Sequence, residues 1–127
     1  MQKSLAIASL CLLLASPALA DGDAEAGAAV FKKCAACHAV GPGAKNKVGP
    51  ELNGIIGRKV AAVDGFNYSS AFKAKAEEGW NWDDTHLSEY LANPKVYIKG
   101  TKMAFPGLKK PDEIANVIAY LKTFSAQ

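Results

Sequence analysis

Two cysteines and a histidine form the most chemically suggestive cluster in this chain of 127 residues. Cys34 and Cys37 are separated by two alanines, and His38 follows directly. Two thiols at this spacing can add across the two vinyl groups of one porphyrin, and the adjacent imidazole can then ligate its iron from one face. The C-x-x-C-H pattern therefore predicts one covalently attached haem c, with His38 as an axial ligand.

Three other chemistries compete for the same residues. A structural disulfide between Cys34 and Cys37 would suit an exported protein, but it leaves His38 without a role. A thioredoxin-like redox pair needs a βαβ setting, which the sequence lacks. A structural zinc site needs four ligands, and residues 21–127 contain only two cysteines and two histidines, with His86 far from the motif. The haem prediction is favoured over all three.

The second axial ligand can be narrowed by elimination. Haem iron accepts His, Met, Cys or Tyr on its other face, or keeps that face open. Both cysteines are used, and Met103 is the only methionine after Met1. It lies in a segment with Gly100, Pro106 and Gly107, where a methionine serving as core filler is less expected. The rival, His86, has polar neighbours and is interpreted as a solvated helix residue, so Met103 is the predicted ligand.

Residues 1–20 have the three parts of a secretory signal peptide. Lys3 gives a positive start, an apolar run spans Leu5 to Leu14, and Ala18-Leu19-Ala20 is a small-residue cleavage signal. The run is about half as long as a membrane-spanning helix, so removal after Ala20 is favoured over a retained anchor. Residues 21–127 are then expected to form a single domain in the periplasm, not integral to the membrane.

Charge is distributed unevenly along this domain. Residues 76–91 contain five acids and no Lys or Arg, whereas residues 92–111 contain five lysines and no acid. The sequence therefore predicts a strong dipole. The formal net charge of only +3, with a single arginine, argues against nucleic-acid binding.

The expected secondary structure is helical. Residues 23–34 and 69–77 favour helices, the first capped by Asp23, and residues 85–92 favour another that begins at Thr85 and stops before Pro94. Residues 41–57 and 96–108 are rich in glycine and proline and are expected to be loops. The clearest helix begins at Pro111 and carries apolar residues at i, i+3, i+4 and i+7 spacing. No strand pattern stands out, so the prediction is an all-α fold.

Several further motifs occur in a characteristic order, and with them the sequence resembles a class I cytochrome c, in particular the bacterial cytochromes c2. The resemblance covers nearly all of Asp23 to Phe124. It implies about three to five helices wrapped around one covalently bound haem. It rests on Gly22-Asp23, Cys34 to His38, Val48-Gly49-Pro50, Gly57-Arg58-Lys59, Gly65-Phe66-x-Tyr68, Trp82, Tyr90-Leu91-x-Asn93-Pro94, Gly100 to Met103 and Ala119 to Lys122.

The resemblance implies roles for residues around the iron and at the helix crossing. Pro50 would offer its carbonyl to His38 and so fix the imidazole tautomer. Tyr90 would donate a hydrogen bond to the Met103 sulfur and tune the reduction potential. The first and last helices would cross where Gly27 meets Tyr120, because glycine permits close approach.

Other roles concern the edge of the haem. Tyr68 and Trp82 would hydrogen-bond a buried haem propionate, and Arg58 would compensate its charge. Besides the two cysteines, the residues implied to bind the cofactor are Pro50, Arg58, Tyr68, Trp82, Tyr90 and Thr101. No catalytic residue is implied.

Two departures from the family pattern stand out. Ala76 to Asn81 is longer than in the mitochondrial relatives, which is expected to place an extended acidic loop near the lower edge of the haem. Phe72 stands where many relatives have an asparagine linked to an internal water and to Tyr90. The inner hydrogen-bond network, and with it the reduction potential, is therefore not predicted from the resemblance.

The resemblance implies a monomeric, non-enzymatic carrier of single electrons. Its donor would be a bc1-type complex, and its acceptor a photosynthetic reaction centre or a terminal oxidase. Lysines flanking Met103, with Lys32, Lys33, Lys45 and Lys47, would ring the exposed haem edge and steer these partners. The main alternative is a haem peroxidase or gas-binding cytochrome with an open sixth site. A weaker alternative keeps the leader as a membrane tether.

Overall fold

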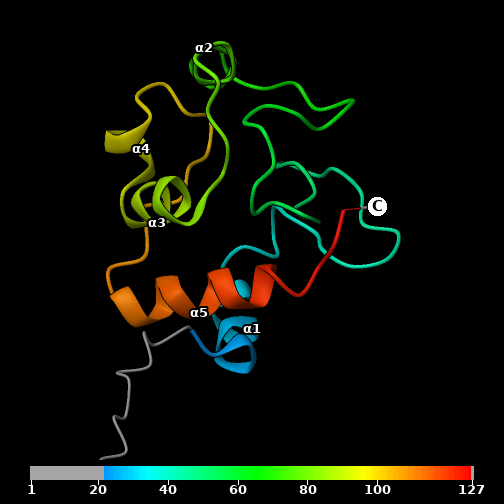
Figure 1. The fold of residues 1–127 in the computed structure, drawn as a ribbon, viewed down its shortest axis with the longest axis vertical. Helices are drawn as coiled ribbons and strands as arrows, with labels where there is room; N and C mark the ends of the chain where they lie inside the picture. Colours follow the sequence, from blue (N-terminus) through cyan, green and yellow to red (C-terminus); the bar gives the residue numbers. More distant parts are fainter. Residues whose placement is uncertain (1–21, 127) are drawn as a thin grey trace, which may run out of the picture.

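The computed structural model describes residues 22–126, so the predicted leader and its cleavage site lie outside the described residues. Five helices follow one another, joined mostly by long loops (Figure 1). They are α1 (Ala24–Phe31), α2 (Ser70–Glu77), α3 (Asp84–Ala92), α4 (Pro94–Tyr97) and α5 (Pro111–Leu121). Residues 22–126 form no strand, only an isolated antiparallel bridge between Lys59 and Asn81. The predicted all-α class and number of helices are confirmed.

Acidic and hydroxyl side chains start the first three helices. Asp23 caps α1 as expected, its carboxylate accepting from the backbone N–H groups of Glu25 and Ala26 at 2.9 and 3.4 Å. Ser69 caps α2 through the N–H of Phe72. The expected start at Thr85 is wrong by one residue. Asp83 is extended and accepts from the N–H of the third residue beyond it at 2.7 Å, which places Thr85 inside the first turn.

Two other predicted boundaries are also wrong: the end of the first helix and the start of the loop expected from Val96. The first helix ends at Phe31 rather than Cys34, and residues 32–37 continue as tighter turns. The segment expected to be a loop from Val96 begins inside α4, a single helical turn with Pro94 at its first position. Proline stops α3 but also fits the first turn of the next helix, because its missing N–H would have had no partner there.

The helices α1 and α5 cross in close contact (Figure 1). A side chain at Gly27 would collide with the carbonyl of Asn116 and lie 2.8 Å from the Tyr120 Cβ, so only glycine permits this approach. Phe31 packs on Tyr120 with a ring separation of 5.5 Å. The predicted meeting of Gly27 and Tyr120 at the crossing is confirmed, and it fixes where α1 ends.

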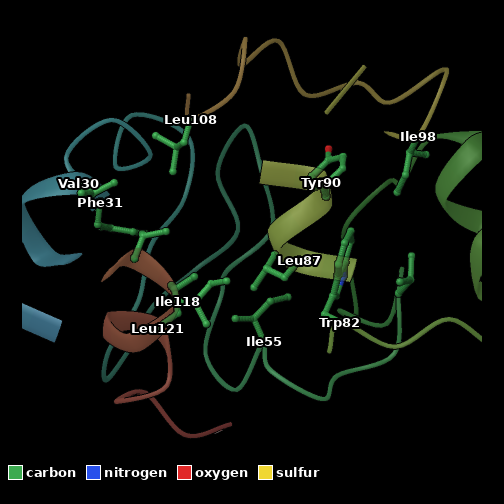
Figure 2. Close-up of a cluster of buried hydrophobic side chains, with 12 residues drawn as sticks. Val30, Phe31, Ile55, Trp82, Leu87, Tyr90, Ile98, Leu108, Ile118 and Leu121 are labelled. Atoms are coloured by element: carbon green, nitrogen blue, oxygen red, sulfur yellow. The ribbon is translucent and has the colours of Figure 1, made fainter. Parts of the chain in front are cut away.

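The core joins α1, α3 and α5 to the loops. Figure 2 shows side chains from all three helices pointing into the same region, with Ile55 and Trp82 contributed by loops. The side chains of Val60, Ile98 and Val117 are almost inaccessible to solvent.

Two loop segments are tied to each other by their backbones. The N–H of Gly57 donates to the carbonyl of Trp82 at 2.7 Å, and the N–H of Trp82 donates to Arg58 at 2.8 Å. The N–H of Val60 donates to Trp80 at 2.9 Å. Residues 57–60 and 80–82 therefore hold one another in register. No helix within residues 22–126 has the length and hydropathy needed to span a bilayer.

The crossing predicts a position-specific loss of stability. Gly27→Ala should lower the free energy of unfolding of the haem-loaded protein by about 1 to 3 kcal/mol, because the added methyl group must push α5 away. Denaturant unfolding measures this change. Ala29→Leu adds more bulk at an exposed position of the same helix and should change stability by no more than about 0.5 kcal/mol. Equal losses in the two variants would contradict the packing argument.

Candidate haem-binding site

The predicted site residues meet in one cavity that is partly open to solvent. Its volume of about 440 Å³ is in the range of small-molecule and cofactor sites. All ten residues expected to bind the haem or its iron line this cavity. They are Cys34, Cys37, His38, Pro50, Arg58, Tyr68, Trp82, Tyr90, Thr101 and Met103.

The two thiols reach the cavity from the turns that follow α1. The N–H of Cys37 donates to the carbonyl of Cys34 at 3.1 Å, and the N–H of His38 donates to the same carbonyl at 2.9 Å. All three residues of this tight turn line the cavity. Both thiols are free and half-buried, and burial raises the pKa of Cys34, which favours its protonated form.

The ring of His38 is held by its backbone surroundings. Its Nδ1 lies 2.7 Å from the carbonyl oxygen of Pro50, which can only accept, so Nδ1 carries the hydrogen and Nε2 keeps its lone pair for a metal. A Cβ at Gly49 would collide with the ring, so that position has room only for glycine. Burial lowers the pKa of His38 despite this hydrogen bond, which favours the neutral imidazole that binds metals.

The wall that carries Met103 contains a short hydrogen bond. The hydroxyls of Tyr90 and Thr101 lie 2.6 Å apart, and Thr101 also accepts from the Met103 N–H at 3.3 Å. In this structure Tyr90 is therefore paired with Thr101, whereas the family resemblance implied the Met103 sulfur as its partner. Burial raises the pKa of Tyr90 to about 12, although the Thr101 contact opposes this shift.

Arg58 places a positive charge at the cavity wall. Its guanidinium donates to the carbonyls of Glu51 and Asn53 at 3.0 and 3.2 Å and lies 3.4 Å from the Glu51 carboxylate. Its Nε is buried and has no hydrogen-bond partner among residues 22–126. Burial lowers the pKa of Arg58 and raises that of Tyr68, whose hydroxyl accepts from the N–H of Val63. A buried cation with an unused donor suits an anionic group in the cavity.

Apolar side chains form the rest of the cavity lining, and most of them were not predicted from the sequence as site residues. The ring of Phe72 packs on Tyr68, Trp82 and Tyr90, with ring centres 6.1, 5.7 and 5.6 Å apart, so Phe72 lies inside an aromatic cluster at the cavity. The periodicity of α5 predicted buried positions but could not separate cavity from core. The other apolar lining residues include Leu52, Ile55, Leu87, Val117 and Leu121.

The rival ligand His86 does not line the cavity. Its interpretation as a solvated helix residue is confirmed only in part: it lies on α3 and is partly exposed, but its ring is partly covered. The side chain is only 26% exposed, and its ring stacks on Trp80 at a separation of 4.1 Å and an angle of 11°. Trp80 lies in the segment between α2 and α3. The spacing of residues in the sequence could not predict that its ring would stack on His86 of α3.

The residues present fit a covalently bound haem. The cavity has mostly apolar walls that suit a porphyrin, two thiols next to each other, and a neutral imidazole and a thioether that suit iron. The unpaired Nε of Arg58 suits a propionate.

Comparisons with known proteins agree with this fit. The family model for cytochrome c matches residues 24–125. The chain is 60% identical over 100 residues to cytochrome c-550 of Ancylobacter novellus, covering 79% of this chain and 94% of the relative. It is 53% identical over 106 residues to cytochrome c2 of Agrobacterium tumefaciens, covering 84% and 95%. The solved cytochrome c2 of Rhodospirillum centenum superposes with a TM-score of 0.79 at 42% identity, covering 83% of this chain and all of that one.

The chain belongs to the cytochrome c family, and the resemblance inferred from its motifs is confirmed. Its fold is that of the class I cytochromes c. Its cofactor is covalently bound haem c, and its general function is that of an electron carrier.

The burial of Tyr90 predicts a specific loss of stability in alkali. Because its pKa rises to about 12 on folding, the folded state holds the phenol proton more tightly than the unfolded chain does. This contribution is complete below about pH 10 and is lost as the pH rises to about 12, a change of about 2 to 3 kcal/mol. Denaturant unfolding across this range should show a shallower decline in Tyr90→Phe than in the wild type. Tyr120→Phe, outside the cavity, is the control, and equal slopes in wild type and Tyr90→Phe would contradict the assignment.

Proposed function

We propose that this chain is a periplasmic one-electron carrier whose haem is attached through Cys34 and Cys37 and ligated by His38 and Met103. The proposal rests on one observation: the two cysteines, His38 and Met103 all line the same cavity. The family supports electron transport. The ligand pair and the cellular role are our inference from these residues.

The bound haem supplies the chemistry, a reversible change of one electron at its iron. The chain provides the setting for that change. The carbonyl of Pro50 holds His38 in the tautomer that leaves Nε2 for the iron. A neutral thioether as second ligand favours the ferrous state and raises the reduction potential.

Other residues of the cavity are proposed to hold the haem without reacting. Arg58 would balance the charge of a propionate, and Tyr68 and Trp82 would bind the same group. The Tyr90 and Thr101 hydroxyls fix the segment that carries Met103, because Thr101 also accepts from the Met103 N–H. If His38 and Met103 both bound the iron, the protein would leave no open site there for oxygen or a substrate, which favours a carrier over an enzyme.

Removing the Met103 thioether tests the ligand pair and the carrier function together. The wild-type ferrous protein should not bind carbon monoxide readily at neutral pH, whereas Met103→Ala should bind it at once, because an axial position becomes available. Absorbance during carbon monoxide titration measures this. Phe105→Leu changes another cavity residue of the same segment and should behave as the wild type. Ready binding by the wild type would favour the peroxidase or gas-binding alternative.

We also propose that residues 1–20 are a signal peptide and that residues 21–127 form the mature domain. The signal-peptide pattern supports this, and the family match and α1 both begin at residue 24. The mass of the protein purified from a periplasmic fraction should correspond to a chain that begins at Asp21. A mass that includes the leader would favour the tethered alternative.

The partners are proposed to dock where lysines approach the cavity. Lys33 and Lys102 line it and are exposed, and Lys32 and Lys47 are also exposed. Positive charges around a redox site raise association rates with acidic partners and orient them. We propose a bc1-type complex as donor and a reaction centre or terminal oxidase as acceptor, with the carrier acting as a monomer.

The lysine rim predicts salt-dependent oxidation by an anion. Lys102→Gln should slow the oxidation of the ferrous protein by hexacyanoferrate(III) roughly twofold to fivefold at low salt, because one attractive charge is lost near the cavity. The difference should vanish near 1 M salt, where the Debye length is about 3 Å. Stopped-flow absorbance measures both rates. Lys122→Gln changes the net charge equally but removes a lysine paired with Asp84, and it should have a smaller effect. A flat salt profile in the wild type would contradict steering.

A further inference from the structure

The carboxylate of Glu51 and the guanidinium of Arg58 form an ion pair beside the haem cavity. The Glu51 Oε1 lies 3.4 Å from the Arg58 Nη1, and the two side chains are only 23% and 15% exposed. Arg58 lines the cavity, whereas Glu51 is not among the described residues that line it. Because solvent and salt screen a partly buried charge less than an exposed one, Glu51 acts more strongly on its surroundings than a surface acid does.

The nitrogens of the Arg58 guanidinium have different surroundings. Nη1 donates to the carbonyl of Asn53 at 3.2 Å and contacts the Glu51 carboxylate, and Nη2 donates to the carbonyl of Glu51 at 3.0 Å. Nε is buried and has no partner among residues 22–126. A propionate that used Nε would therefore be the second anion on a cation that already pairs with Glu51.

The charge of Glu51 also acts on a residue of the cavity wall. Burial raises the pKa of Tyr68, the Val63 N–H and the charge of Arg58 oppose this rise, and the charge of Glu51 adds to it. Tyr68 lines the cavity. In this part of the cavity, Arg58 therefore favours negative charge and Glu51 offsets part of that effect.

We propose that Glu51 is a positioning residue that acts through Arg58 and lowers the reduction potential of the haem. The inference rests on the proposed function, because it requires the haem to lie in this cavity. Reduction adds one negative charge to the haem, which the charge of Arg58 stabilises and that of Glu51 destabilises. The pair presents less positive charge to the haem than Arg58 alone would, so the carrier gives up its electron more readily.

A structural role of the same carboxylate can be separated from this effect. The Glu51 Oε2 accepts from the N–H of Asn53 at 2.7 Å. The side-chain amide of Asn53 in turn accepts from the N–H of Gly41 at 2.7 Å and donates to its carbonyl at 2.9 Å. Glu51 therefore also helps to hold two loop segments together. A glutamine at position 51 has the same length and keeps an oxygen that can accept from Asn53, but it carries no charge.

The test measures the midpoint potential of the haem-loaded protein at neutral pH. Glu51→Gln should raise it, so that the ratio of reduced to oxidised protein at the wild-type midpoint increases roughly twofold to sixfold, the effect of removing one partly screened charge. Glu51→Asp keeps the charge, and its potential should lie closer to that of the wild type than to that of Glu51→Gln.

Asp64→Asn is the matched control. Asp64 is exposed and lines, with Glu51 and Arg58, a second and polar hollow. The substitution removes an equal charge, and its effect on the potential should be smaller and should disappear in about 1 M salt. The effect of Glu51→Gln should persist there, because the pair with Arg58 is partly buried.

Denaturant unfolding gives a readout independent of potential. Glu51→Ala loses both the charge and the acceptor for Asn53, so it should raise the potential as Glu51→Gln does and also unfold at a lower denaturant concentration. An unchanged or lower potential in Glu51→Gln, or an equal shift in Asp64→Asn, would overturn the proposal. So would a potential that changes only in the variant that loses stability, because that pattern indicates a structural role. None of these results would affect haem attachment or Met103 ligation, which absorbance and carbon monoxide binding report separately.

Discussion

The contact between Gly27 and the backbone of α5 is the interaction on which the rest of the structure depends. It lets α1 and α5 cross so closely that Phe31 packs on Tyr120, and the turn carrying the two thiols follows directly. The same helix α5 supplies apolar residues to the cavity. A chain of this length has a limited core, so a large prosthetic group enclosed by these elements takes the place of much of it.

Buried polar groups around the cavity are matched by short-range partners. His38 uses the carbonyl of Pro50, Tyr90 uses Thr101, and most of the Arg58 guanidinium uses the carbonyls of Glu51 and Asn53. These hydrogen bonds fix the side chains before any ligand contributes, which limits reorganisation when the charge at the iron changes. The Nε of Arg58 is the exception: it is buried and has no hydrogen-bond partner among the described residues, so it could serve an anionic group such as a propionate.

Sequence reasoning worked where the signal is local. The C-x-x-C-H motif, the Asp23 cap and the periodicity of the last helix each depend on residues a few positions apart, and the cap and the helix are found as predicted. The family motifs extended the assignment, since every residue that they implied to bind the haem or its iron lines one cavity. Local signals failed to predict α4, because Pro94 was interpreted only as the end of the preceding helix, whereas it also begins α4.

The features that could not be predicted arise from contacts distant in the sequence or from a choice between near neighbours. His86 appeared solvated because its neighbours along the chain are polar, yet Trp80 covers its ring from the preceding loop. Tyr90 pairs with Thr101 and not with Met103, two residues further on, and the sequence pattern does not distinguish these two neighbours. Phe72 indicated that the inner network differs from the family pattern, and only the packing shows that the Phe72 ring contacts Trp82 and Tyr90.

The most direct test of the central claim is the optical spectrum of the purified protein in both oxidation states. The account predicts the bands of a haem whose porphyrin is attached to the chain through two cysteine thioether bonds. In the ferric state it also predicts the weak long-wavelength band of a sulfur-to-iron bond, and Met103→Ala should lose this band. A colourless protein, or a ferric spectrum without the sulfur-to-iron band, would contradict it.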